Sequence, residues 1–227
     1  MMTILMIRPV GFAYNSETAV NNAFQTAGHG PGIQGQALAE FDHFVDTLRA
    51  IDIDILTVED TPVPQTPDSI FPNNWVSFHE DGTAVLYPMF ATNRRLERKR
   101  HVIEAIEQEF VVRRWLDYTA YEQEGRFLEG TGSMVLDRRN RLAYACCSPR
   151  TDEALFRIVC AELGYQPILF RAEDDRGIAV YHTNVLMCVT SAHAIVNLEA
   201  IASEDRDRVV GPLRETGKVL VPLTHAQ

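Results

Sequence analysis

The chain has 227 residues, a formal net charge of −10 at pH 7 and 46% hydrophobic residues, which are ordinary values for a soluble globular protein. An acidic chain of this kind is not expected to bind nucleic acid or an anionic membrane surface. It contains no apolar run near the roughly 20 residues that span a bilayer, so we expect one soluble domain covering residues 1–227.

Short β-rich runs alternate along the chain with stretches whose apolar residues recur every three or four positions. The apolar opening reads as a first strand, because it lacks the basic start and cleavage site of a signal peptide. The predicted strands are 3–9, 54–58, 75–79, 84–89, 110–115, 133–137, 141–147, 167–172, 180–190, 193–197 and 218–224. The predicted helices are 35–51, 93–109, 151–164 and 204–216.

Tight turns join pairs of these strands, and Asp81-Gly82 is the strongest hairpin signal among them. A hairpin, a helix and a further strand then follow one another about three times, over roughly 70–115, 130–172 and 180–222. The three segments share a pattern rather than residues. The sequence therefore predicts a single α/β domain built from repeated ββαβ units.

The four cysteines, Cys146, Cys147, Cys160 and Cys188, match no zinc-binding pattern. We expect them to be reduced thiols of a cytoplasmic protein, and to serve as core or wall residues.

Polar residues stand at corresponding places in the three repeats. The first repeat offers Asp68, Asn73 and Asn74, the second offers Glu129, and the third offers His182 and Asn184. Equivalent positions of a pseudo-symmetric array converge on one axis, so we expect these side chains to meet. Two residues apart in a predicted strand, His182 and Asn184 would share a face.

Each of these side chains also has a simpler explanation. Glu129 before Gly-Thr-Gly can be a solvated turn residue, and a histidine in an apolar strand is often a hydrogen-bonded core residue. The asparagines after Pro72 can form an Asx turn. Arg94 and Arg150, each between a strand and a helix, can be surface charges.

Taken together, "PDSIFPNNWVSF", "LEGTGSMVLDRRNRLAYACCSPRT" and "YHTNVLMCV" resemble the guanidino-group-modifying enzyme superfamily. Its members include dimethylarginine hydrolases, arginine deiminases and amidinotransferases, which share the pentein fold, a five-bladed α/β-propeller of ββαβ units. The closest resemblance is to the amidinotransferase-like citrulline hydrolases of bacteria, whose "RPxxFxxNxxTxxNNxFQ" pattern is matched from Arg8 to Gln25. The resemblance covers essentially the whole chain.

The resemblance implies roles for five residues. Asp68 matches an aspartate that binds the substrate's α-ammonium group. Arg150 of "CCSPRT" matches an arginine that binds the α-carboxylate, and Arg94 matches a second such arginine with a one-residue gap. His182 matches the general acid/base histidine, and Glu129 resembles the acid of the family's "EGG" motif, although here the text is "EGTGS".

Asn73, Asn74 and Asn184 stand where relatives that bind a guanidinium carry acids. A guanidinium favours carboxylates, whereas a neutral ureido group presents both donors and an acceptor, which an amide can match. These replacements favour citrulline as the substrate. Arginine, a methylated arginine or an amidino donor remains the alternative, as does a propeller that binds an amino acid without reacting.

The superfamily's nucleophilic cysteine lies in a last blade that has no match in residues 1–227. We therefore expect the last unit and its nucleophile to be absent from this chain, which alone should be inactive. The complete enzyme would be a hydrolase of non-peptide carbon–nitrogen bonds, using a Cys-His-Glu covalent mechanism. No metal or organic cofactor is implied. The expected partner is a small amino-acid substrate, with a homo-oligomer possible through the exposed flank.

Overall fold

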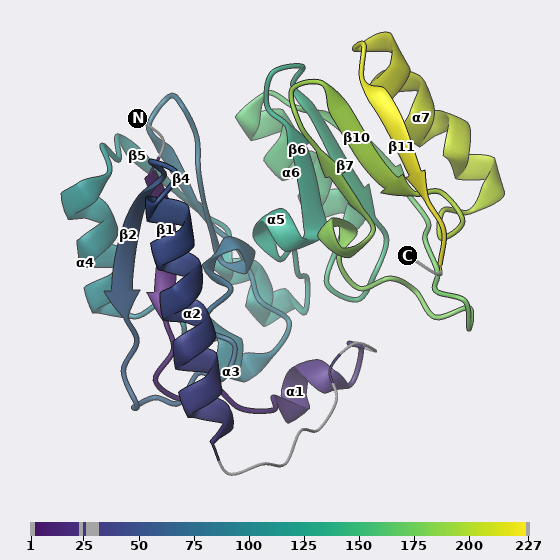
Figure 1. Ribbon diagram of the computed structural model, residues 1–227. Coiled ribbons are helices and arrows are strands. Elements are labelled where there is room, and N and C mark those ends of the chain that lie inside the picture. The colour runs from purple at the N-terminus through teal and green to yellow at the C-terminus, as the bar shows by residue number, and fades with distance from the viewer. Residues whose placement is uncertain (1–2, 23–24, 26–31, 226–227) are drawn as a thin grey trace. The chain divides into compact units, whose positions relative to one another are not determined.

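The computed structural model describes residues 3–22, 25 and 32–225, and its secondary structure confirms the predicted α/β class (Figure 1). The chain forms two compact units. Unit 1 comprises Met1–Leu86 and Ala91–Asp117, and unit 2 comprises Tyr87–Phe90 and Tyr118–Gln227. That the whole chain behaves as one domain stays a prediction.

Unit 1 contains a two-stranded parallel sheet and a three-stranded mixed sheet. Helix α2 packs its apolar side against the first sheet, where Phe41 and Val45 contact Ile55 in a small core. The elements in order are β1 (Thr3–Arg8), α1 (Ser16–Ala19), α2 (Ile33–Arg49), β2 (Asp54–Glu59), η1 (Pro72–Asn74), β3 (Val76–Phe78), β4 (Thr83–Leu86), α3 (Thr92–Arg95), α4 (Arg100–Glu109) and β5 (Arg114–Asp117).

Unit 2 contains two three-stranded mixed sheets that share one hydrophobic core. Strand β7 is buried along its whole length, so its run of apolar residues shows no alternation. The elements in order are η2 (Thr119–Glu124), α5 (Gly130–Ser133), β6 (Met134–Asp137), β7 (Leu142–Cys146), α6 (Glu153–Leu163), β8 (Gln166–Phe170), η3 (Thr183–Val185), β9 (Met187–Val189), β10 (His193–Asn197), η4 (Ser203–Asp205), α7 (Arg206–Glu215) and β11 (Val219–Leu223).

The predicted ββαβ repeat is confirmed in three sheets. In each, an antiparallel hairpin is followed by helix and then by a strand parallel to the hairpin's second strand, in the orders β3-β4-β5, β6-β7-β8 and β9-β10-β11. Because a parallel connection needs a crossover, the helix after each hairpin is what allows the third strand to pair. The turns that precede the hairpins therefore occupy equivalent places, and they carry the candidate site residues other than Arg94 and Arg150, which follow the hairpins.

The single helix predicted over 93–109 is wrong, because two helices occupy this stretch. Helix α3 ends at Arg95, and α4 begins at Arg100 with Lys99 as its N-cap residue. Both Arg94 and Lys99 are buried with acidic partners, Glu97 and Asp60. The break between the helices accommodates both charged side chains in the interior, which a continuous surface helix would leave in solvent.

The continuous strand predicted over 180–190 is also wrong. His182 is extended, but residues 183–185 form the 3₁₀ turn η3, and only Met187–Val189 is a strand. His182 and Asn184 therefore do not share a strand face. His182 is buried and Asn184 is exposed. The alternation argument failed because a polar turn interrupts the apolar pattern at the place where the histidine is presented.

Gly82 provides a test of the hairpin between β3 and β4. Its φ is +83°, and a Cβ built there would lie 2.7 Å from the Cγ of Arg113. We expect Gly82→Ala to lower the free energy of unfolding by about 1–3 kcal/mol, measured by urea denaturation. Gly35→Ala in α2 is the matched control, since among the described residues nothing beyond its chain neighbours and its own helix backbone lies within 4 Å of a Cβ built there. It should be neutral or stabilising by up to about 1 kcal/mol; equal effects at both sites would contradict this account.

Candidate active site

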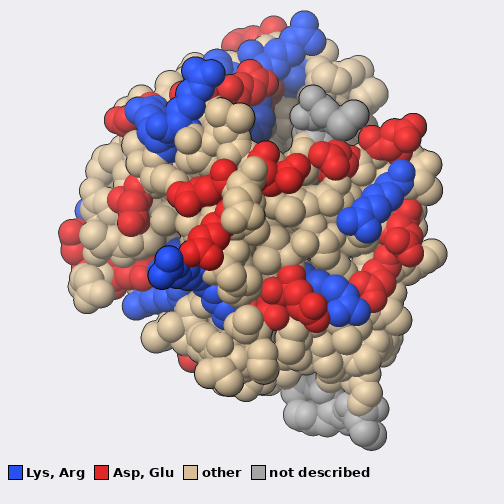
Figure 2. Space-filling view, turned by 90° about the vertical axis from the view of Figure 1, so that its left-hand side faces the viewer, with Lys and Arg blue, Asp and Glu red and all other residues tan. Residues whose placement is uncertain are grey.

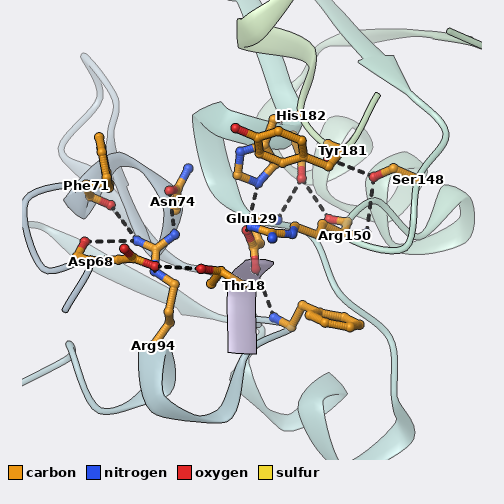
Figure 3. A network of polar contacts seen from close by, with 12 residues as sticks. Thr18, Asp68, Phe71, Asn74, Arg94, Glu129, Ser148, Arg150, Tyr181 and His182 are labelled. Carbon is orange, nitrogen blue, oxygen red and sulfur yellow. Dashed lines mark hydrogen bonds and ion pairs between the residues drawn. The ribbon is translucent and has the colours of Figure 1, made fainter. Parts of the chain in front are cut away.

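A short contact joins two predicted site residues, His182 and Glu129. The Nε2 atom of His182 lies 2.7 Å from Oε2 of Glu129, and both side chains are buried. Glu129 immediately precedes α5, and His182 immediately precedes η3, so two turns in equivalent repeats present the pair. The expectation that these two residues meet is confirmed within unit 2, and Figure 3 shows their contact.

The carboxyl group of Glu129 has donors on both oxygens. Its Oε1 accepts the backbone N–H of Phe90 at 3.0 Å, and its Oε2 is shared by His182 and by Nη1 of Arg150 at 3.3 Å. An ionised carboxylate only accepts hydrogen bonds, and donors on both oxygens favour that form. Nε2 of His182 therefore carries a proton and donates it in the hydrogen bond to Glu129. Nδ1 is then the ring nitrogen that can exchange a proton with a substrate.

A second layer of hydroxyl groups fixes the two turns. Thr183, next to His182, donates its hydroxyl to the backbone oxygen of Ser133 at 2.6 Å and accepts the N–H of Cys146 at 2.8 Å. The hydroxyl of Ser133 in turn donates to the backbone oxygen of Arg150 at 2.7 Å. The geometry of the pair is thus set by buried contacts that leave the turns little freedom to move.

In unit 1 the guanidinium of Arg94 organises the turn that carries the asparagines. It donates to both oxygens of Glu97, at 2.8 and 3.0 Å, to Oδ1 of Asn74 at 2.8 Å and to the backbone oxygen of Phe71 at 3.1 Å. Figure 3 shows the guanidinium with Asn74, Phe71 and Asp68 around it. Asn74 therefore serves as an acceptor for Arg94 in this structure.

Asp68 lies in the same unit and accepts from the N-terminal segment. Its Oδ2 receives the side-chain amide of Asn15 at 2.7 Å and lies 3.1 Å from the hydroxyl of Thr18. Asn15 also exchanges hydrogen bonds with Asn93, which joins α1 to the start of α3. The guanidinium of Arg94 is 4.0 Å from the same carboxylate oxygen. Asp68 is thereby positioned by Asn15 and Thr18, which belong to the N-terminal pattern from Arg8 to Gln25.

A buried ion pair supports the loop that leads to Asp68. Lys99 donates from Nζ to Oδ1 of Asp60 at 2.6 Å and to the backbone oxygens of Thr61 and Pro64 at 2.8 and 2.9 Å. Thr66 donates to the other oxygen of Asp60 at 2.8 Å. Burial by itself raises the pKa of the Asp60 carboxyl, but the bonds from Lys99, the Thr61 backbone and Thr66 outweigh it and hold the pKa below its ordinary value.

The structure brings some of the predicted residues together and not others. Within unit 2 it joins Glu129, His182 and Arg150, and within unit 1 it joins Asp68, Asn74 and Arg94. Asn73 is half-buried and Asn184 is exposed. The convergence of both groups on one axis, and the substrate-binding roles of Asp68, Asn73, Asn74, Arg94, Arg150 and Asn184, stay predictions.

The sequence did not identify the residues that hydrogen-bond to the predicted site residues and position them. Glu97 is three residues after Arg94, a spacing that suits a helical ion pair, but it reads as a surface charge. Asn15 and Thr18 had a signal, because both lie inside the N-terminal pattern from Arg8 to Gln25. Nothing in the sequence marked Ser133, since a serine after two glycines is common in turns.

Burial disfavours the thiolate form of three of the four cysteines. Burial raises the pKa of Cys146 and of Cys160 to about 12, and it raises the pKa of the half-buried Cys147 as well. Cys188 is exposed on β9. A thiol acts as a nucleophile only as its thiolate, so these three are poorly suited to be nucleophiles, and Cys146 and Cys160 belong to the buried core. Among the described residues, no three His, Cys, Asp or Glu side chains are grouped so that they would hold a metal ion.

A model of the family "N,N dimethylarginine dimethylhydrolase, eukaryotic" matches residues 8–227. No curated protein sequence matches the chain. Among solved structures, the substrate-bound N-terminal domain of ArgZ, an arginine dihydrolase from the ornithine-ammonia cycle in cyanobacteria, is 17% identical with a TM-score of 0.73. That match covers 97% of this chain and 76% of the ArgZ domain.

Two further structures share the fold. A cysteine-to-alanine mutant of AgrE, solved with L-arginine, is 16% identical with a TM-score of 0.74, covering 100% of this chain and 31% of AgrE. An adduct of dimethylarginine dimethylaminohydrolase is 15% identical with a TM-score of 0.62, covering 97% and 75%. These matches confirm the predicted pentein-type α/β fold, and with the family model they confirm the predicted superfamily.

The Lys99–Asp60 pair predicts how stability depends on pH. The lowered pKa of Asp60 contributes stability that is present above the ordinary aspartate pKa of about 4 and is lost as the pH falls through the lowered value. Lys99→Met should reduce the free energy of unfolding at pH 7 by about 3–5 kcal/mol, because Asp60 is left buried and unpaired.

The matched control is Arg100→Met. Arg100 is the residue after Lys99, and the substitution removes its exposed ion pair with Glu104. It should cost no more than about 0.5 kcal/mol. Urea denaturation at pH 7 and pH 3 measures both variants. The account of this ion pair is contradicted if Lys99→Met loses no more stability than Arg100→Met at pH 7.

Proposed function

Because this chain belongs to the family of N,N-dimethylarginine dimethylhydrolases, we propose that it supplies the acid–base residues of a hydrolase that acts on a guanidino or ureido amino acid. The family match confirms the predicted class, hydrolases of carbon–nitrogen bonds other than peptide bonds. The observation that carries the proposal is the buried 2.7 Å contact between Nε2 of His182 and Oε2 of Glu129. A histidine held by an ionised carboxylate is an effective general acid and base.

The proposed reaction has two steps. A cysteine thiolate attacks the central carbon of the guanidino or ureido group, and His182 donates a proton to the nitrogen that leaves. His182, now neutral, takes a proton from water, which attacks the same carbon and releases the thiolate. Glu129 stabilises the charged imidazole that exists before the first proton transfer and again after the second. The ArgZ domain solved with a covalently bound reaction intermediate supports a covalent route for the fold.

We propose that the thiol is supplied from outside residues 1–227. Three of the cysteines are disfavoured as thiolates by burial. The fourth, Cys188, is exposed on β9. The cysteine-to-alanine mutant of AgrE that holds L-arginine supports a role for a cysteine in that protein.

Citrulline is the first proposed substrate, and arginine or a methylated arginine is the second. The ureido argument needs amides at the recognition positions Asn73, Asn74 and Asn184, and of these the amide oxygen of Asn74 accepts a hydrogen bond from Arg94. The arginine alternative is favoured by the neighbours, whose structures contain L-arginine or come from an arginine dihydrolase. Binding without reaction would need the same buried contacts but no thiol.

The surface charge and the helices bear on which other partners are expected. On the face shown in Figure 2, acidic side chains are interleaved with Lys and Arg, and no broad basic patch is present there. None of the described helices is long and apolar enough to cross a membrane. Cytoplasmic location and assembly into a homo-oligomer stay predictions.

The reaction is tested with the complete protein that contains this chain. We expect it to release ornithine and ammonia from citrulline, and we expect His182→Asn or Glu129→Gln to lower kcat by about 10²–10⁴-fold. The control is His193→Asn, which changes an exposed histidine on β10. Turnover of arginine alone would refute citrulline as the substrate. Full activity of His182→Asn would refute the acid–base role of His182. Residues 1–227 alone should be inactive.

The asparagines are tested as a pair of variants. Asn73→Asp should shift the ratio of kcat/KM toward arginine over citrulline by about tenfold or more, because a carboxylate favours a cation. Asn74→Asp should instead strengthen the pairing with Arg94 and leave the ratio near its wild-type value. If both substitutions leave the substrate preference unchanged, the amides do not read the substrate's head group.

A further inference from the structure

The aromatic ring of Tyr181 lies against the imidazole of His182, the next residue in the chain. The two ring centres are 4.7 Å apart, and the ring planes are inclined to each other by 42° (Figure 3). A separation of this size is typical of aromatic pairs that attract one another. Tyr181 is half-buried and His182 is buried, so contact with the tyrosine ring accounts for part of the imidazole's burial.

The main chain on both sides of Tyr181 is anchored to β7 and to the loop that follows it. The hydroxyl of Ser148 donates to the backbone oxygen of Tyr181 at 2.8 Å. The thiol of Cys146 donates to the backbone oxygen of Val180 at 3.3 Å, and the backbone N–H of Cys146 donates to the hydroxyl of Thr183 at 2.8 Å. These bonds fix the segment 180–183, from which the Tyr181 ring projects.

The same ring also lies near a guanidinium. The guanidinium carbon of Arg150 is 4.9 Å from the centre of the Tyr181 ring, within the roughly 6 Å range of a cation–π contact. His182 becomes a second cation when it is protonated, and its ring centre is 4.7 Å away. The electron-rich ring of Tyr181 therefore lies beside both positive charges of this cluster.

We propose that Tyr181 is a positioning residue that acts through His182, an inference that rests on the proposed acid–base role of His182. The tyrosine ring restricts rotation of the imidazole and so keeps Nε2 directed at Glu129, which it contacts at 2.7 Å. The negative π face of the ring also stabilises the imidazolium form. Tyr181 thereby adds to the stabilisation of the proton donor that the proposed first step requires.

The groups that set the charge of His182 come from separate elements. Glu129, before α5, favours the imidazolium, and Arg150, in the loop after β7, opposes it at the shared carboxylate oxygen. Replacing the ring of Tyr181 leaves both of these groups in place, so the resulting change in the titration of His182 isolates the contribution of the ring. Arg150 keeps its predicted role of binding a substrate carboxylate, because the ring requires none of its N–H donors.

The proposal is tested by nitrogen-15 NMR of histidine side chains in residues 1–227, with His182 assigned by its absence in His182→Asn. In Tyr181→Leu the pH midpoint of His182 should fall by about half a unit, because the π face is gone while an apolar side chain still covers the imidazole. Tyr181→Phe keeps the ring and should keep the wild-type midpoint.

The matched control is Tyr121→Leu, which removes another half-buried tyrosine of unit 2. The Tyr121 ring centre lies 4.6 Å from the guanidinium carbon of Arg126, so this substitution also removes a cation–π contact. Tyr121→Leu should leave the His182 midpoint at its wild-type value. An unchanged midpoint in Tyr181→Leu, or an equal fall in Tyr181→Phe, would overturn the proposal.

Kinetics of the complete protein separate positioning from direct contact with the substrate. The positioning role predicts that Tyr181→Leu lowers kcat by about threefold or more with a smaller change in KM, and that Tyr181→Phe restores kcat. A rise in KM with an unchanged His182 midpoint would show that the ring contacts the substrate instead, and would overturn the proposal. Lack of turnover by the wild-type complete protein would refute the proposed function, whereas the midpoints measured in residues 1–227 would still show whether the ring stabilises the imidazolium.

If Tyr181→Leu does not fold, the wild-type chain still decides the question. The carbon-13 signals of the Tyr181 ring, assigned by their absence in Tyr181→Phe, should shift with pH at the midpoint of His182, because the charge forms 4.7 Å from the ring centre. Ring signals that stay constant through the His182 titration would overturn the proposal.

Discussion

The buried carboxylate of Glu129 is the constraint on which the site depends. A carboxylate with no exposed surface must be satisfied by donors, because removing an ion from water costs several kcal/mol. The Phe90 backbone, Arg150 and His182 provide them. These three come from separate segments of unit 2, so the satisfaction of one carboxylate fixes where the segments lie relative to each other.

In unit 1 the buried charge is a cation, Arg94, which must be satisfied by hydrogen-bond acceptors. The guanidinium of Arg94 is satisfied by Glu97, by the amide of Asn74 and by the Phe71 backbone, and these bonds shape the turn before β3. Lys99 does the same for the loop that starts at Asp60. In both units the turns ahead of the hairpins are held by buried charge, which gives them defined geometry without regular secondary structure.

The repeat was predictable because it depends on local signals. Hairpin turns, apolar runs and helical spacing each act within a few residues, and together they determine the ββαβ order. The corrected elements are those where tertiary contacts overrule local preference. Arg94 and Lys99 turn inward and divide a helix, and the turn after His182 interrupts a strand.

The candidate site was predictable only as a set of residues. The sequence and its resemblance pointed to Glu129, His182 and Arg150, and the contact of Glu129 with His182 followed from the repeat. That Arg150 would face Glu129 could not be read from the sequence, because its burial depends on Tyr181 and Phe90, which are distant along the chain. The hydrogen bond from Arg94 to Asn74 could not be predicted either, because the two residues are also distant along the chain.

The central claim is that Glu129 is an ionised carboxylate inside unit 2. The most direct measurement is the carbon-13 chemical shift of its side-chain carboxyl, followed from pH 5 to pH 8 and assigned by its absence in Glu129→Gln. The account predicts the shift of an ionised carboxylate throughout this range, with only a small change as His182 titrates. A carboxyl signal in the protonated position at pH 7 would contradict it, since Glu129 would then be a donor and could not hold the proton on His182.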